Sequence, residues 1–217
     1  MERLTTPDIL AAGLDGWSKL AQGLHARFAI ADFPAGAAFV TAVATAAEAA
    51  AHHPDLTLRY GAVDVVLATH EEGMWVTSKD VDLARTISAI ARDHGLTTAP
   101  AAVVQVELGL DTAHAGRLGP FWSAVLTGEP GNVVGNTVLD PAGLAPNVWF
   151  QPTDEHSEPR QRWHLDVWVA PEVADARIAA AVGAGGVVVD DSEAPSFTVL
   201  ADPDGNKACI CTALERG

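Results

Sequence analysis

A short run of small residues with one proline divides this chain into two halves with different patterns. Residues 96–102 read Leu-Thr-Thr-Ala-Pro-Ala-Ala, a composition that interrupts regular structure and suits a connection between domains. A chain of 217 residues is long enough for two domains of about a hundred residues each. The sequence therefore predicts a first domain at 1–96, a linker at 97–102 and a second domain at 103–217.

Charge and composition exclude two classes of partner. The formal net charge is −15, and both halves are acidic, so neither offers a basic surface for a phosphate backbone. No apolar run approaches the ~20 residues of a membrane span. The first residues also lack the apolar core of a signal peptide. We therefore expect no nucleic-acid partner, no membrane association and a cytoplasmic location.

The first half predicts helices packed on one face of a small antiparallel sheet. Helical spacing of apolar residues alternates with strand-like alternation, and Pro54 forces the longest helical pattern to end. The predicted elements are a helix at 8–20, a strand at 24–31, a helix from Pro34 to just before Pro54, a hairpin that ends at His70, and a helix from Thr77 or Ser78 to Gly95.

The second half predicts one βαβββ motif used twice. The first copy has a strand at 103–110, a helix at 113–126 and two or three strands between 133 and 151. The second has a strand at 162–169, a helix at 171–182 and strands near 187–189, 196–200 and 207–212. Both halves therefore mix helices with sheets, and the predicted fold class is α+β. The two cysteines, Cys209 and Cys211, lie on one face of a predicted strand and are not placed to form a disulfide.

Three histidines form the candidate site of the first half. His52 and His53 lie where a predicted helix ends, and His70 ends a neighbouring strand. Imidazole has an unperturbed pKa near neutrality, so a pair of histidines can share general-acid and general-base roles in removing water from a substrate. The alternative is a set of surface histidines near a helix C-terminus, where the dipole favours imidazolium. The His-His-Pro sequence alone favours that alternative.

A wider set of residues changes the interpretation. In this order, over about residues 8–95, they resemble the pterin-4a-carbinolamine dehydratase family. The matching residues are Gly16-Trp17, Arg27-Phe28, Asp32-Phe33, Phe39-Val40, Ala47-Glu48, His52-His53-Pro54-Asp55, Tyr60, Val63, Leu67, Thr69-His70, Thr77, Asp80 and Leu83-Ala84.

The resemblance implies dehydration of 4a-hydroxytetrahydropterin to the quinonoid dihydropterin, with no metal or organic cofactor. It implies that His52 and His70 assist departure of the 4a-hydroxyl and loss of the ring-nitrogen proton, and that His53 contacts the pterin. It also implies a homo-oligomer, a dimer or a tetramer. An alternative within the same family is a non-catalytic module for dimerisation or stabilisation.

Three further residues support the site by the same resemblance. Pro54 fixes the turn after the histidine pair, and Glu48, four residues before His52, lies on the same helix face. Asp80 supports the site or simply satisfies the first turn of its helix. Between His70 and Asp80 the chain is one residue longer than the usual pattern. Trp75 in this segment could stack on a pterin or plug the domain seam.

The second half resembles the glyoxalase and bleomycin-resistance superfamily, also called vicinal oxygen chelate. The resemblance rests on residues 163–169, on the turn Asp202-Pro203-Asp204-Gly205-Asn206, and on the repeated βαβββ order. In metal-using members four ligands come from the first and last strands of the repeats. The corresponding residues here are Gln105 or Glu107, one residue within 149–151, His164 and Cys209.

That ligand set is poor in the imidazoles and carboxylates that a hard divalent metal prefers. Cys209 reads as a small buried hydrophobe, and a lone His164 on a mixed face is more often structural than a ligand. We therefore expect no bound metal and a second domain that binds an unassigned small molecule or shapes the oligomer. The alternative is a metal-dependent lyase or dioxygenase regulated by the first domain.

Overall fold

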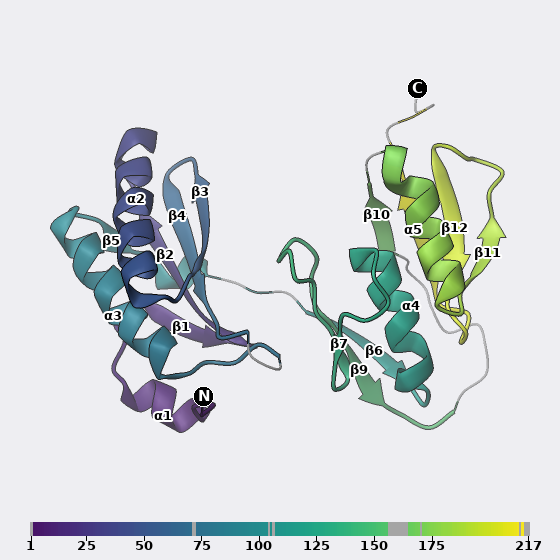
Figure 1. Ribbon diagram of the computed structural model, residues 1–217, viewed down its shortest axis with the longest axis horizontal. Coiled ribbons are helices and arrows are strands. Elements are labelled where there is room, and N and C mark those ends of the chain that lie inside the picture. The colour runs from purple at the N-terminus through teal and green to yellow at the C-terminus, as the bar shows by residue number, and fades with distance from the viewer. Residues whose placement is uncertain are drawn as a thin grey trace. The chain divides into compact units, whose positions relative to one another are not determined.

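The computed structural model divides into two compact units, Met1–Gln105 and Val106–Gly217. It describes residues 2–70, 73–103, 105, 107–155, 165–169, 171–212 and 214. Each unit mixes helices with a sheet, so the fold class is α+β, as the sequence predicts (Figure 1).

Unit 1 is an antiparallel sheet with helices on one face. The strand order is β1-β2-β4-β3, and β5 pairs with the same edge of β2 as β1 does, beyond the end of β1. The elements are α1 (Thr6–Ala11), β1 (Trp17–Leu20), β2 (Gly23–Ala29), α2 (Phe33–Ala50), β3 (Asp55–Arg59), β4 (Ala62–Leu67), α3 (Ser78–Asp93), β5 (Thr97–Thr98) and the 3₁₀ turn η1 (Pro100–Ala102).

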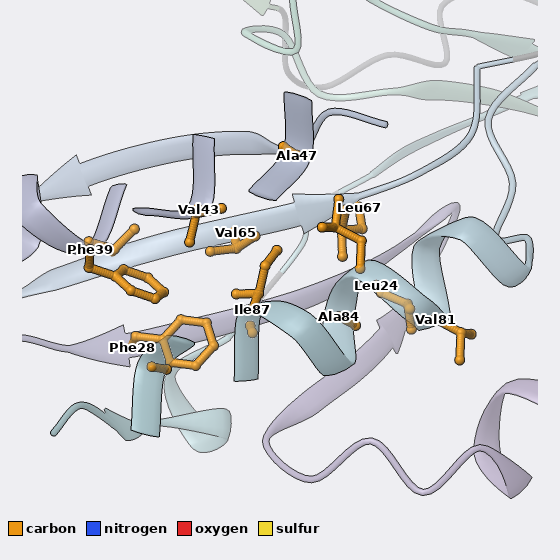
Figure 2. Packing of buried hydrophobic residues seen from close by; sticks show 14 of the residues in the cluster. Leu24, Phe28, Phe39, Val43, Ala47, Val65, Leu67, Val81, Ala84 and Ile87 are labelled. Atoms are coloured by element: carbon orange, nitrogen blue, oxygen red, sulfur yellow. The ribbon is translucent and has the colours of Figure 1, made fainter. Parts of the chain in front are cut away.

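The core of unit 1 lies between this sheet and helices α2 and α3. Strand residues alternate, so Val63, Val65 and Leu67 of β4 are buried while the residues between them are half-buried. Figure 2 shows Phe28 of β2 and Phe39 of α2 in this core, with ring centroids 5.1 Å apart. Aromatic pairs at this separation stabilise a core beyond their buried area. Ala47, near the end of α2, is buried in the same core, so the packing extends to where the candidate site begins.

Helix α2 is apolar along most of its length. By length and composition alone, with a mean hydropathy of 1.3, this helix could cross a membrane, and 22% of it is buried inside the protein. Asp32 caps its first turn by accepting a hydrogen bond from Ala35 N at 2.8 Å, and Phe39 and Val43 are fully buried in the core. These contacts are those of a helix that packs on a sheet.

The predicted helix at 8–20 is wrong in its second half. Helix α1 ends at Ala11, and Trp17–Leu20 forms strand β1. Gly13 and Gly16 both have positive φ, +62° and +81°, a conformation that breaks a right-handed helix and that glycine adopts at little cost. The apolar residues of this segment therefore belong to two different elements, and they range from the buried Ile9 to the exposed Leu10.

The seam between the halves differs from the predicted one. Thr97–Thr98, placed in the linker by sequence, pairs with β2 through Phe28 and Ala29. Ala99 N also donates to Arg27 O at 2.8 Å. These backbone bonds tie residues 97–99 to the first sheet.

Unit 2 is built from two sheets with the same topology. One has the order β6-β9-β8-β7 and the other β10-β13-β12-β11, and in each the first strand of the repeat runs parallel to the last. The elements are β6 (Leu108–Thr112), α4 (Ala115–Thr127), β7 (Val133–Val134), β8 (Thr137–Val138), β9 (Val148–Pro152), β10 (Leu165–Trp168), α5 (Pro171–Gly183), β11 (Val187–Asp190), β12 (Phe197–Ala201) and β13 (Lys207–Cys211). The repeated βαβββ motif is thus present in the fold.

Candidate active site in unit 1

The buried carboxylate of Asp80 is the hub of the candidate site. Asp80 is the third residue of α3 and its side chain is 0% exposed. Its Oδ2 accepts from Thr77 N at 2.7 Å and from the Thr69 hydroxyl at 2.8 Å. Its Oδ1 lies 2.7 Å from His52 Nε2. A buried carboxylate requires such partners, and here one partner is a predicted catalytic residue.

The chain reverses immediately before His52. Helix α2 ends at Ala50, Ala51 adopts a left-handed conformation with φ +46°, and His52 N donates to Ala47 O at 3.2 Å. That conformation costs an L-residue about 1 kcal/mol, and Pro54 prevents the helix from continuing instead. The strained reversal places a side chain that is only 10% exposed against Asp80.

The contact with Asp80 determines which nitrogen of His52 is available. A carboxylate oxygen accepts, so Nε2 carries the hydrogen and donates it to Oδ1. Nδ1 is then the nitrogen left to exchange a proton with a substrate.

His53 and Glu48 form a separate, exposed pair. Their closest atoms, Nε2 and Oε2, are 3.2 Å apart, and the side chains are 65% and 84% exposed. The sequence placed Glu48 on the helix face of His52, but the carboxylate contacts His53 instead. Pro54 lies half-buried in the connection between α2 and β3. Because both side chains are exposed, they are accessible to a ligand. An exposed pair of this kind contributes little to the stability of the fold.

His70 begins the loop that follows β4. Its neighbour Thr69 exchanges two backbone hydrogen bonds with Trp75, at 2.7 and 3.1 Å, which close the loop. His70 is exposed, and within the described part of the chain its ring makes no hydrogen bond or ion pair. It is connected to His52 through Thr69 and Asp80. That the three imidazoles share one pocket stays a prediction.

Trp75 is held by its own loop and by the N-terminal segment. The Arg3 guanidinium carbon lies 4.8 Å from the Trp75 ring centroid, and Leu4 N donates to Val76 O at 2.9 Å. Gly73 has φ +134°, and a Cβ there would lie 2.4 Å from the indole. Trp75 is therefore held in place by contacts on both sides and already has a contact partner.

Two residues of the site match the family in sequence, but the sequence assigned them no role in the site. Thr69 and Thr77 are buried, their hydroxyl oxygens are 2.8 Å apart, and both lie within hydrogen-bonding distance of Asp80 Oδ2. The signal for Thr77 was the spacing Thr-x-x-Asp, which marks a helix start. For Thr69 the signal was its place among the residues that match the family, and its role depends on a carboxylate eleven residues away.

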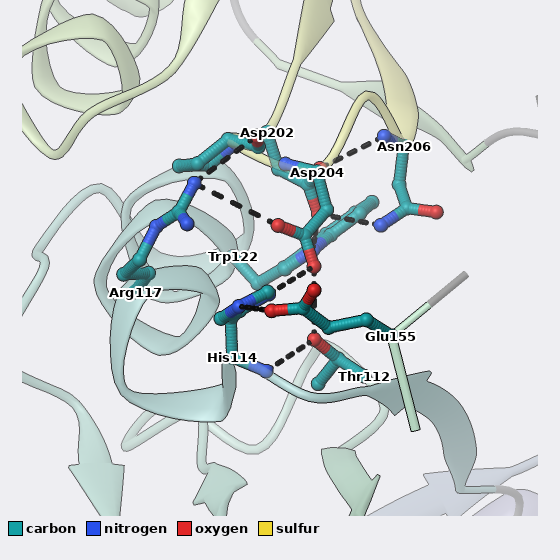
Figure 3. Close-up of polar contacts among 9 residues, drawn as sticks. Thr112, His114, Arg117, Trp122, Glu155, Asp202, Asp204 and Asn206 are labelled. Carbon is teal, nitrogen blue, oxygen red and sulfur yellow. Dashed lines mark hydrogen bonds and ion pairs between the residues drawn. The ribbon is translucent and has the colours of Figure 1, made fainter. Parts of the chain in front are cut away.

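Unit 2 contains a second buried carboxylate, Asp202, in the turn between β12 and β13 (Figure 3). Its Oδ1 accepts from Asp204 N at 2.9 Å and Asn206 N at 2.8 Å. Its Oδ2 accepts from Asn206 Nδ2 at 2.8 Å and Trp122 Nε1 at 3.0 Å. Burial raises the pKa of Asp202, opposed by these hydrogen bonds. Since Trp122 belongs to α4, the carboxylate braces one repeat against the other.

The neighbouring Asp204 extends this brace to the start of α4. Its Oδ2 accepts from the Thr112 hydroxyl at 3.0 Å and lies 3.4 Å from His114 Nδ1, while its Oδ1 lies 3.7 Å from Arg117. His114 Nε2 faces Glu155 at 3.3 Å. Carboxylates thus lie beside both ring nitrogens of His114, a residue that the sequence argument did not single out.

The described members of the predicted metal set do not fit a hard divalent ion. Gln105 belongs to unit 1, where its amide donates to Gln22 at 3.2 Å. Glu107 accepts from Asn147 at 3.3 Å, and Cys209 is a buried thiol. His164 lies outside the described residues. Across the described ranges, no group of three His, Cys, Asp or Glu side chains is arranged to hold a metal.

Comparisons with known proteins match each unit separately. Residues 2–90 match the family model for pterin 4 alpha carbinolamine dehydratase, and residues 107–211 match that of a glyoxalase-like domain. A protein of Thermosynechococcus vestitus provisionally named pterin-4-alpha-carbinolamine dehydratase is 44% identical over 92 residues, which are 42% of this chain and 96% of the relative. A similarly named protein of Chloroflexus aurantiacus is also 44% identical over 92 residues and is covered to 98%.

Two solved structures are also similar. The transcriptional coactivator/pterin dehydratase from Brucella melitensis has 38% identity and a TM-score of 0.39, covering 42% of this chain and 99% of its own. A glyoxalase/bleomycin resistance protein from Albidiferax ferrireducens has 22% identity and a TM-score of 0.36, covering 51% and 98%. On the family model and the identity of its relatives, the chain belongs to the pterin-4a-carbinolamine dehydratase family through unit 1 and carries a glyoxalase-like domain in unit 2.

Proposed function

We propose that this protein dehydrates 4a-hydroxytetrahydropterin to the quinonoid dihydropterin. The observation that carries the proposal is the His52–Asp80 pair, at 2.7 Å and almost fully buried, within a chain of the dehydratase family. The reaction removes a hydroxyl from C4a and a proton from a ring nitrogen, which leave together as water. It needs one group that protonates the departing hydroxyl and one that accepts the ring proton.

In this proposal His52 and His70 share the two proton transfers. Asp80 holds Nε2 of His52, so Nδ1 is the atom that exchanges a proton. His70 is exposed and directly follows Thr69, which pairs with Trp75. His53 contacts the pterin from the exposed side, with Glu48 beside it and Pro54 fixing the turn.

The experiment is an assay of carbinolamine dehydration with the full chain. His52→Ala and His70→Ala should each reduce kcat by about a hundredfold or more, since positioned proton transfer contributes about 10²–10⁴-fold. His94→Ala, at an exposed histidine of the same unit, is the control and should be unchanged. An unaltered rate for His52→Ala would remove the enzyme proposal and favour the non-catalytic module.

We also propose that the protein forms a homodimer through β3, the last strand in the sheet order of unit 1. An antiparallel pair centred on Thr57 would set Asp55 of one copy opposite Arg59 of the other, at both ends of the pair. Opposite charges in that position favour pairing, and like charges oppose it. The strand is thus self-complementary.

Charge reversal tests this assembly by sedimentation. Arg59→Asp should yield monomers, because two acidic pairs then meet, and the double variant Asp55→Arg/Arg59→Asp should restore the dimer. A double variant that stays monomeric, or a wild type that never dimerises, would contradict pairing through β3.

For unit 2 we propose a metal-free role in binding a small molecule or shaping the oligomer. The hydrogen bonds of Gln105 and Glu107 and the burial of Cys209 support it. The metal-dependent alternative rests on His164. Stoichiometric metal in the purified wild type that is lost in His164→Ala would overturn the metal-free proposal, whereas no metal in either protein would support it.

A further inference from the structure

The division of hydrogen bonds between the two oxygens of Asp80 decides how His52 is held. Oδ1 faces Nε2 of His52, and this contact persists only while the carboxylate keeps that oxygen in line with the ring nitrogen. A partial rotation of the carboxylate about its Cβ–Cγ bond would move Oδ1 out of line with Nε2. Something must therefore fix Oδ2, and backbone Thr77 N supplies only one bond to it.

Two buried hydroxyls complete the hold on Oδ2. Thr69 Oγ1 lies 2.8 Å from Oδ2, Thr77 Oγ1 lies 3.1 Å from it, and the two hydroxyl oxygens are 2.8 Å apart. Each hydroxyl has a single hydrogen. The distances favour a chain in which Thr77 donates to Thr69 and Thr69 donates to Asp80. Oδ2 then receives two hydrogen bonds, one from an amide and one from a hydroxyl.

The same geometry offers a substitute when one hydroxyl is removed. Without the Thr69 hydroxyl, Thr77 can turn its hydrogen to Oδ2 at 3.1 Å. Without the Thr77 hydroxyl, Thr69 still donates at 2.8 Å. Only removal of both leaves Oδ2 with the amide alone. The pair is therefore redundant, and redundancy predicts strongly non-additive effects of substitution.

We propose that the hydroxyl pair of Thr69 and Thr77 positions His52 by fixing the orientation of the Asp80 carboxylate. This inference rests on the proposed function only for its effect on turnover. The two threonines are positioning residues, since they act through Asp80. Thr69 also closes the loop that begins with His70, through its backbone bonds to Trp75. One residue thus connects the supports of both imidazoles.

The test compares four variants of the full chain: Thr69→Val, Thr77→Val, the double valine variant and the double serine variant. Valine keeps the branched shape and removes the hydroxyl, and serine restores the hydroxyl. The matched control is Thr41→Val/Thr45→Val on α2, where both exposed hydroxyls donate to the carbonyl four residues back at 2.9 and 3.0 Å. Thermal unfolding is recorded for each.

The decisive readout is the tautomer of His52, measured from imidazole ¹⁵N shifts at pH ~8, above the usual imidazole pKa. We expect Nε2–H alone in the wild type, the serine variant and the control, and a mixture of tautomers in the double valine variant. Turnover should fall by about a hundredfold in that variant and within about threefold in each single variant, because a wrong tautomer disables a catalytic imidazole. Double valine with an unchanged tautomer and near-wild-type turnover overturns the proposal.

The single variants keep the proposal testable if double valine does not fold. Thr69→Val leaves the longer hydroxyl contact and Thr77→Val the shorter one, so Thr69→Val should shift the His52 signals more. Equal or reversed effects would contradict the pair. A wild type without dehydratase activity would end the proposed function, while the tautomer measurement would still decide the role of the threonines.

Discussion

The two units contain buried carboxylates that use their oxygens differently. Asp80 gives one oxygen to the start of its own helix and the other to His52. Asp202 gives one oxygen to its own turn and shares the other between that turn and Trp122. Both carboxylates satisfy local backbone donors. Only Asp80 is in contact with a group that can exchange a proton near neutral pH.

This difference separates a structural carboxylate from one built for chemistry. All donors to Asp202 are amides or an indole, which keep their hydrogens at any ordinary pH. The imidazole that contacts Asp80 belongs to His52, which precedes the exposed His53 and has a second ring nitrogen. Burial alone therefore does not mark a functional acid; the titration of its partner does.

The largest expected effect comes from replacing the two buried carboxylates themselves. Asp80→Asn should lower kcat for carbinolamine dehydration by about a thousandfold, because an amide facing His52 can impose the other tautomer. Asp202→Asn should lower the stability of the chain and leave turnover per folded molecule unchanged. Equal losses of turnover in both variants would show that the two carboxylates do not differ in kind.

Trp122→Phe tests whether Asp202 has a structural role. The change removes the Nε1 donor from Asp202 and keeps an aromatic ring in the core. We expect a loss of about 1–3 kcal/mol in the free energy of unfolding, the usual cost of leaving a buried acceptor without its hydrogen-bond donor. Urea unfolding of the full chain measures it, with Trp149→Phe as the control. A loss no greater than that of the control would refute the brace.

A second imidazole in unit 1 provides a contrast to His52. Burial lowers the pKa of His25 below its usual 6.5, Lys19 lowers it further, and a hydrogen bond with Gln105 opposes the shift. The folded state therefore resists protonation of His25. Its contribution to stability is present above about pH 6.5 and is lost as the pH falls through the lowered folded value.

The measurement is the unfolding midpoint between pH 7.5 and 5. His25→Gln should reduce the loss of stability on acidification, by about 1 kcal/mol or less, while His94→Gln should not. A wild-type pH dependence that survives unchanged in His25→Gln would show that this imidazole titrates normally.

Glu48→Gln should have the smallest effect on stability. The carboxylate is exposed, and its contact with His53 is 3.2 Å, so solvent screens the pair. We expect an unchanged melting temperature and, if Glu48 assists the pterin, a raised KM with little change in kcat. A clear drop in melting temperature would place Glu48 with Asp80 and Asp202 instead.

Periodicity predicted most of the fold. The apolar spacing of 34–50 and 78–93 gave two of the helices of unit 1, and the repeated order in the second half matched the two sheets. The wrong predictions concern short segments whose conformation depends on particular glycines or on pairing with a neighbouring strand. Gly13 and Gly16 override helical spacing, and the two-residue strand β5 exists only because an edge of β2 was open to it.

The candidate site was predicted only as far as its residue types. His52, His53, His70 and Asp80 follow from their order in the chain, but the pairing of Glu48 with His53 depends on the reversal at Ala51. The Thr69 hydroxyl belongs to the site because it lies 2.8 Å from Oδ2 of Asp80, a residue eleven positions away in the chain. Contacts of this kind arise from packing, which no spacing rule along the chain encodes.

The most direct test of the central claim is a crystal structure of the full chain with a bound reduced pterin. We expect the pterin within hydrogen-bonding distance of His52 Nδ1, with His70 on the same ligand and Asp80 still bound to Nε2. A pterin bound away from His52, or an imidazole of His52 turned from Asp80 in the complex, would contradict it.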